Sequence, residues 1–200
     1  MLFRSIEHKL DVEVIDATGQ TFVPRPRQNR QLRPFIEAFE IARGVATPKS
    51  GTQRHSPLNR LGDINLGVCG FTVPPLDEQG TPIVRADRCN AVALIRAPPM
   101  VVAYKPFSET LPTVVGAFMA AEDVDTALKK SEPPAHDRWD PDSVNLRDAE
   151  GAGKGVVSAV LSRVKAGLKR FQSEAAPPAP ARQKRLSLLE RALGSYFRPT

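Results

Sequence analysis

The sequence predicts an α+β domain, with a small, mostly antiparallel sheet, a few packed helices and a basic C-terminal helical tail. Short apolar runs typical of strands follow one another between residues 64 and 120, and apolar residues recur at helical spacing over 157–171. Residues 151–200 are strongly basic. A chain of 200 residues with 41% hydrophobic side chains has enough apolar material for one domain with a real core.

The N-terminal part is expected to hold a hairpin followed by a helix. Apolar and polar residues alternate over 10–14, and a turn at 17–20 leads into a second short strand. Apolar spacing after Pro34 then predicts a helix over 33–43 that ends before Gly44. Residues 45–62 are almost free of apolar side chains, so we expect a solvated or partner-ordered loop there.

Four strand-like runs follow this loop. Residues 64–71 can show apolar atoms on both faces, as a central strand does. Residues 90–96, 100–104 and 113–120 come in quick succession, and their short connections favour antiparallel neighbours.

Two helices are predicted in the remaining part of the body. Acidic residues at 122–123 and lysines at 129–130 match the dipole of a short helix over 122–130. Residues 135–150 are expected to be irregular and held by Trp139, the only tryptophan. The clearest helix is amphipathic, and its apolar face carries Val157, Val160, Leu161, Val164, Leu168 and Phe171.

The organisation along the chain is therefore expected to have four parts. Residues 1–149 form the α+β body and 150–173 the amphipathic helix. An Ala/Pro-rich linker over 174–183 precedes a basic amphipathic tail helix within 184–200.

Charge is distributed unevenly along the chain. The net charge is +6, but residues 151–200 hold ten Lys and Arg against only Glu174 and Glu190, which leaves the remainder near −2. A basic tail on a near-neutral body points to a polyanion, an acidic partner surface or an anionic membrane face.

The leading functional hypothesis is a non-enzymatic accessory subunit or scaffold domain of a larger bacterial assembly, located in the cytoplasm. It would dock a protein partner through its tail helix, because a tethered amphipathic helix can insert into a partner's groove. The anchoring side chains would be Leu186, Leu189, Leu193 and Phe197, with Lys184, Arg185 and Arg191 steering the encounter.

The alternative hypothesis is nucleic-acid binding without sequence preference. Basic residues near the N-terminus are interleaved with polar side chains that can contact phosphate, and a second basic set lies on the amphipathic helix. Few aromatic residues accompany them, so base stacking is not indicated. The candidate residues are Arg25, Arg27, Arg30, Arg163, Lys165, Lys169 and Arg170.

A second alternative is a hydrolase or transferase that uses His136. Asp137, Asp140 and Asp142 lie nearby in the sequence, and a carboxylate can orient an imidazole and raise its basicity. Adjacent residues seldom point to one site, so a surface cluster is the simpler interpretation. No catalytic residue is assigned on this pattern.

Cofactor and metal sites are not expected. The glycine-rich residues 150–155 depart from the phosphate-loop spacing, which needs a glycine at Asp148 and a Ser or Thr at Gly155. Cys69 and Cys89 lack the paired spacing of a zinc site and are expected to be small buried side chains. No apolar run is long enough to span a bilayer, so no transmembrane segment is expected.

Part of the chain resembles a known group of proteins. Residues 92–104, 116–120 and 131–139 resemble the distal region of uncharacterised bacterial proteins related to the Hsp90 and MutL (GHKL) type of ATPase. The Asp-x-Gly-x-Gly nucleotide motif of that group is missing here, so the resemblance implies an accessory region without the ATPase core.

Overall fold

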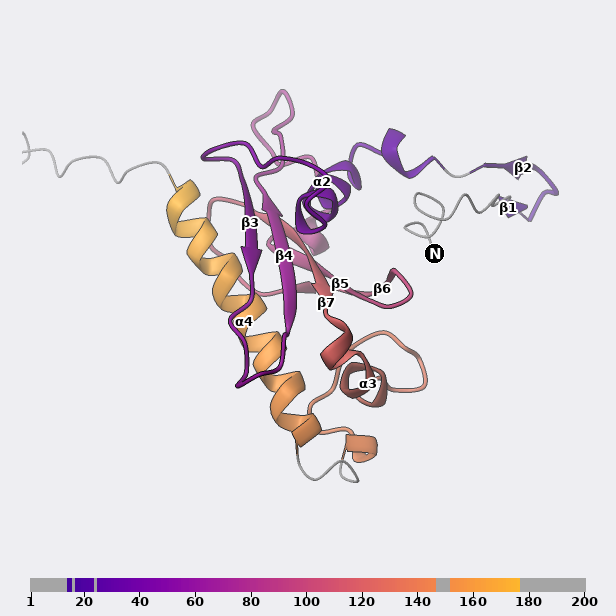
Figure 1. Cartoon of the computed structure of the whole chain (residues 1–200). Helices are drawn as coiled ribbons and strands as arrows, with labels where there is room; N and C mark the ends of the chain where they lie inside the picture. Colours follow the sequence, from indigo (N-terminus) through magenta and orange to yellow (C-terminus); the bar gives the residue numbers. More distant parts are fainter. Residues whose placement is uncertain (1–13, 16, 24, 147–151, 177–200) are drawn as a thin grey trace, which may run out of the picture.

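The computed structural model describes residues 14–15, 17–23, 25–146 and 152–176, and it has the predicted α+β class. A five-stranded mixed sheet lies between α2 on one face and α4 on the other (Figure 1). The elements are β1 (Val14–Ile15), β2 (Thr21–Phe22), η1 (Pro26–Gln28), α2 (Arg33–Ala42), β3 (Gln53–Pro57), β4 (Gly67–Thr72), η2 (Ala86–Arg88), β5 (Ala91–Arg96), β6 (Met100–Pro106), β7 (Val115–Ala120), α3 (Glu122–Lys130), η3 (Val144–Leu146) and α4 (Ala152–Ala175).

The face of the sheet under α2 is built from small side chains. Ala91, Ala93 and Ala117 point to this face and are fully buried with the apolar side of α2. At Gly70 of β4 the helix comes so close that an added Cβ would overlap the carbonyl oxygen of Ala38. The small residues therefore let α2 approach the sheet backbone closely.

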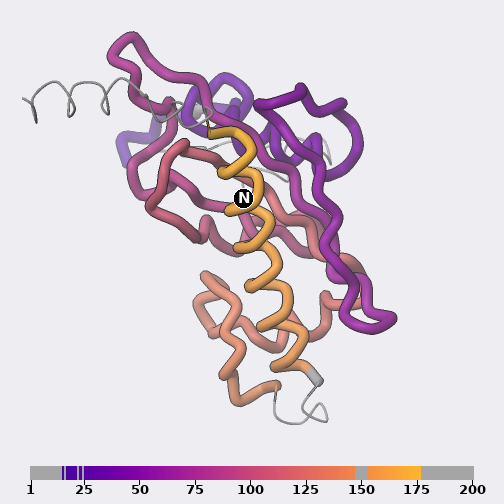
Figure 2. Tube along the Cα trace, turned by 90° about the vertical axis from the view of Figure 1, so that its left-hand side faces the viewer, coloured from indigo at the N-terminus to yellow at the C-terminus, as the bar shows by residue number. Residues whose placement is uncertain are grey.

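The opposite face carries larger side chains and is covered by α4, which crosses it as Figure 2 shows. The predicted apolar face of this helix is confirmed for Val157, Val160, Val164 and Leu168, which are fully buried, and for Phe171, which is nearly so. Leu161 lies at the margin and is half-buried. The helix runs to Ala175, two residues into the expected linker.

Trp139 holds the irregular segment after α3, as predicted. Its side chain is 2% exposed and meets the Phe118 ring edge-on, with the ring centroids 5.9 Å apart. Leu146 is buried in the same core cluster. Residues 131–146 are thus packed onto the body although they contain little regular structure.

The expected strand pairing is wrong at one position. The strand order is β3-β4-β7-β5-β6, so β7 lies between β4 and β5 and pairs with β5 in parallel. Residues 107–114 carry the chain past β5 to reach that place, and eight residues easily cross two strand spacings of about 4.8 Å. Apolar content alone does not reveal such a crossing.

The expected loop over 45–62 is also wrong in part, because β3 lies inside it. This polar strand pairs antiparallel with β4 at the edge of the sheet. An edge strand is held mainly by backbone hydrogen bonds, and polar residues are common in it. Its sequence therefore lacks the apolar alternation that predicts a strand. Its last residue, Pro57, is compatible with an edge position.

The N-terminal hairpin is confirmed by the pairing of β1 with β2, although both strands are short. Residues 1–13 lie outside the described part. The basic tail helix expected within 184–200 and most of the linker before it also lie outside the described residues.

Candidate functional site

A basic groove lies between α4 and the segment that follows β6, and we call it the α4 groove. It has a volume of about 790 Å³. Lys165 and Lys169 reach it from one face of α4, and Lys105 reaches it from β6. Glu109 is the only carboxylate in its lining, so positive charge dominates. The hydroxyl-bearing residues in the lining are Ser108, Thr110, Ser158 and Ser162.

A buried polar network holds the loop side of this groove. Asn90 donates to the carbonyl oxygen of Thr110 over 2.9 Å and accepts the backbone N–H of Val114 over 2.9 Å. Gln172 of α4 donates to Asn90 Oδ1 and to the carbonyl oxygens of Thr110 and Pro112. These bonds tie residues 110–114 to α4, so both sides of the groove have a fixed spacing.

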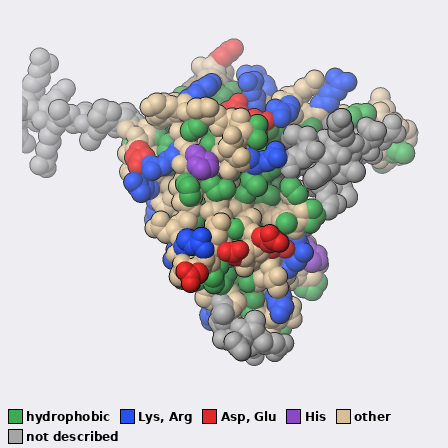
Figure 3. Space-filling view, viewed as in Figure 1, with side chains coloured by type: hydrophobic (Ala, Val, Ile, Leu, Met, Phe, Trp, Pro, Cys, Tyr) green, Lys and Arg blue, Asp and Glu red, His purple; other side chains and the backbone are tan. Residues whose placement is uncertain are grey.

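A second basic cavity lies on the other side of the sheet, beside α2, and we call it the α2 pocket. It has a volume of about 520 Å³. Arg30, Arg33 and Lys49 line it, with Glu37 as its only carboxylate. Figure 3 shows Lys and Arg side chains gathered along the upper edge of the molecule, over α2. The other lining residues are Pro34, Thr52, Gln53, Thr72, Val73, Pro75, Leu76 and Ile83.

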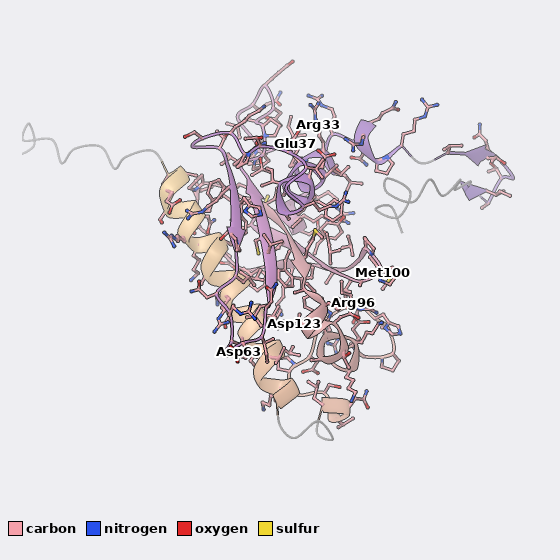
Figure 4. All side chains as sticks on the ribbon, viewed as in Figure 1. Arg33, Glu37, Asp63, Arg96, Met100 and Asp123 are labelled. Carbon is pink, nitrogen blue, oxygen red and sulfur yellow. The ribbon has the colours of Figure 1, made fainter. Side chains whose placement is uncertain are left out.

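A buried ion pair joins the end of β5 to the segment after α3. Arg96 is 7% exposed and donates through Nε and Nη2 to the two oxygens of Glu132, the second bond measuring 2.8 Å. The same carboxylate accepts the indole N–H of Trp139 over 3.2 Å. Figure 4 labels Arg96 at the lower end of β5, above α3.

His136 completes this cluster from the surface. Its Nδ1 lies 2.7 Å from Glu132 Oε2, while its side chain is 63% exposed and its φ angle is +50°. Burial alone would raise the pKa of Glu132, but hydrogen bonds from Arg96, His136 and Trp139 outweigh it and hold the pKa below its ordinary value. Such a carboxylate stays ionised and orients the imidazole.

The carboxylate beside His136 is therefore Glu132 and not one of the three aspartates that the sequence indicated. Asp142 pairs instead with Lys154 over 2.6 Å, and that lysine lowers the pKa of Asp142. Asp140 accepts the backbone N–H of Asp142. His136 lines neither the α4 groove nor the α2 pocket.

The basic residues indicated for nucleic-acid binding are spread over several surfaces. Lys165 and Lys169 share the α4 groove, whereas Arg30 lies in the α2 pocket. Arg163 donates to the carbonyl oxygen of Asn59, and Arg170 contacts Glu174 over 3.3 Å. Arg25 is exposed before η1, and Arg27 pairs with Glu40 over 2.6 Å.

Sequence patterns did not indicate Lys105 and Glu132, two of the residues that define these sites. Lys105 is one charge near the end of an otherwise apolar strand, and only the fold sets it opposite α4. Glu132 stands between Ser131 and Pro133, where nothing distinguishes it from a solvated residue. A charged residue at the end of a buried run, such as Arg96, is a weak signal that a partner is required.

Both cysteines are free: Cys69 is buried, which raises the pKa of its thiol, and Cys89 is half-buried. Among the described residues, no group of three or more His, Cys, Asp or Glu side chains could hold a metal ion. None of the helices in this part of the chain has the length and apolar character needed to cross a membrane.

Comparison of the chain with protein-family models, with curated proteins and with solved structures finds no match. The resemblance of residues 92–139 to the Hsp90 and MutL group stays a prediction.

Proposed function

We propose that this chain is a non-enzymatic binding protein that holds nucleic acid in the α4 groove through phosphate contacts. The observation that carries the proposal is the convergence of Lys105 of β6 with Lys165 and Lys169 of α4, two distant parts of the sequence, around one open groove. Phosphate contacts set affinity without reading sequence, so we expect little sequence preference.

The geometry of the groove favours an extended anionic chain. Lys165 and Lys169 are four residues apart and therefore lie one above the other on the same helix face. Ser162 donates its hydroxyl to the carbonyl oxygen of Ala159, and the hydroxyls of Ser108 and Thr110 bond to each other, whereas the Ser158 hydroxyl in the lining can donate to a phosphate oxygen. Phe107 supplies one aromatic ring, with Lys105 Nζ 5.9 Å from its centroid, which allows limited stacking with a base.

The docking of a protein partner through Leu186, Leu189, Leu193 and Phe197 stays a prediction, because these residues lie outside the described part of the chain. We do not extend the proposal to catalysis at His136. That side chain is oriented by Glu132, but it lines neither cavity, so nothing positions a substrate against it.

The experiment measures the affinity of the full chain for a labelled single-stranded oligonucleotide by fluorescence anisotropy over a range of salt concentrations. Replacing the two lysines that α4 contributes to the groove, Lys165→Gln with Lys169→Gln, removes two phosphate contacts. Each phosphate contact with a single strand contributes about 0.7 to the slope of log affinity against log salt, so the slope should fall by about 1.4 in magnitude. The effect should be similar for different base sequences.

The matched control is Arg60→Gln with Lys130→Gln, which removes the same charge from two exposed side chains outside the groove. If the control lowers affinity and salt slope as much as the groove variant does, binding follows net charge and the assignment to the groove is wrong. Absence of binding by the unchanged protein at low salt would also exclude the proposal.

A further inference from the structure

The α2 pocket is independent of the groove proposed to bind nucleic acid. It is formed by α2, the connection from α2 to β3, and the end of β4, on the face of the sheet opposite α4. We infer that this pocket binds a small organic phosphate, with the phosphate against its cations and the carbon skeleton against its apolar wall. This inference does not depend on the proposed function.

The cations of the pocket are only partly satisfied within the described chain. Glu37 is engaged by Arg33, whose Nε donates to Glu37 Oε1 over 3.1 Å, and Figure 4 shows the two side chains together on α2. Arg30 and the Lys49 ammonium group make no ion pair with any residue that the structure describes. The pocket thus holds more positive than negative charge, as an anion site requires.

The start of α2 also has charges of the wrong sign for helix stability. The N-terminal end of a helix carries partial positive charge and favours acidic side chains. Here Arg33 is the first helical residue and the first turn contains no acidic residue, while Asn29 already accepts the backbone N–H groups of Gln31, Leu32 and Arg33. A bound phosphate would therefore act through its charge, by offsetting the positive charge that the arginines add at this end of the helix.

The remainder of the pocket separates a polar side from an apolar side. The cations come from α2, the turn before it and the connection after it, whereas Val73, Leu76 and Ile83 come from the end of β4 and the loop that follows. Leu76 is 59% exposed, so its side chain is accessible to the carbon skeleton of a ligand in the pocket.

Size and polar groups agree with a small ligand. A volume of about 520 Å³ lies in the range of about 300–1,000 Å³ that small-molecule pockets occupy. Gln53 uses its Oε1 to accept the backbone N–H of Lys49, so its amide NH₂ group remains able to donate to a ligand oxygen. Thr72 adds a hydroxyl group to the lining.

The test uses isothermal titration calorimetry on the full chain with three probes: phenyl phosphate, inorganic phosphate and phenol. Phenyl phosphate should bind most tightly, because it alone engages both sides of the pocket. Lys49→Gln and Arg30→Gln should each lower the affinity for phenyl phosphate and for inorganic phosphate by about tenfold, because each variant loses one charged hydrogen bond. Leu76→Ser should lower the affinity for phenyl phosphate and leave the affinity for inorganic phosphate unchanged.

Controls separate this site from the α4 groove and from loss of folding. Lys105→Gln, in the groove, should leave phenyl phosphate binding unchanged, and the Arg30 and Lys49 variants should keep the melting temperature of the unchanged protein. Lack of saturable phenyl phosphate binding, or equal binding by the Lys49 variant, overturns the inference. If Lys49→Gln and Arg30→Gln instead weaken oligonucleotide binding while phenyl phosphate binds equally to all variants, the pocket belongs to a nucleic-acid surface.

Discussion

The helices α2 and α3 are held to the body in different ways, since α2 packs on the sheet whereas α3 follows β7 and packs mainly against α4. Around α3 two acidic side chains have partners inside the chain: Asp123 accepts the backbone N–H of Asn65 over 2.8 Å, and Asp125 lies 3.3 Å from Lys129. The segment after α3 is held by the buried pair of Arg96 and Glu132. By contrast, α2 is held by apolar packing over Gly70, and its first turn carries an arginine.

Charges with partners inside the chain, such as those of Asp123 and Glu132, serve the fold, whereas the cations of the α2 pocket that are unpaired within the described residues are available for a ligand. Charges near α3 are placed as the helix dipole favours, with acidic residues in the first turn and lysines in the last. The cations near α2 oppose that preference and lie beside a cavity. Removing a paired charge near α3, above all the buried one of Glu132, should therefore lower stability, whereas removing a cation of the α2 pocket should mainly alter binding.

The largest effect is expected from Glu132→Gln. The change leaves the buried Arg96 guanidinium without its carboxylate, and breaking a buried pair in this way costs about 3–5 kcal/mol. Urea denaturation of the full chain measures the free energy of unfolding. The same replacement at the exposed Glu78 is the control and should change stability by less than about 0.5 kcal/mol; equal effects at both positions would contradict the role given to the ion pair.

A smaller loss is expected from Gly70→Ala, which tests the packing of α2. The new methyl group would overlap the backbone of Ala38, so α2 must shift, and overpacking of this kind costs about 1–3 kcal/mol. Gly155→Ala is the matched control, because a Cβ at Gly155 of α4 meets nothing within 4 Å and should stabilise the helix by about 0.5–1 kcal/mol. Similar melting temperatures for the two variants would argue against the close approach of α2.

The smallest effect on the free energy of unfolding is expected from lowering the pH. Glu132 has a lowered pKa in the folded chain, so on acidification it takes up a proton later there than in the unfolded chain. Its contribution to stability is therefore complete above the unfolded-state pKa and is lost as pH falls through the folded-state pKa. Unfolding free energies measured from neutral pH downward should fall less steeply in Glu132→Gln than in the unchanged protein, and parallel curves would exclude Glu132 as a source of the acid sensitivity.

Local patterns predicted the elements that bury a regular apolar face. The helices α2, α3 and α4 and the strands β4 to β7 lie close to their expected positions, because side-chain periodicity reflects burial directly. The polar strand β3 was missed, since an edge strand depends on backbone pairing. The insertion of β7 between β4 and β5 was missed because strand order depends on the path of residues 107–114.

The candidate sites divide in the same way. Helical spacing alone placed Lys165 and Lys169 on one face of α4, and the tail charges follow directly from composition. Only the tertiary structure set Lys105 opposite those lysines, paired Arg96 with Glu132, and brought Arg30, Arg33 and Lys49 around one pocket. The physical reason is that periodicity records which face of one element is buried, whereas a site needs side chains from elements whose proximity is decided by the packing of the whole chain.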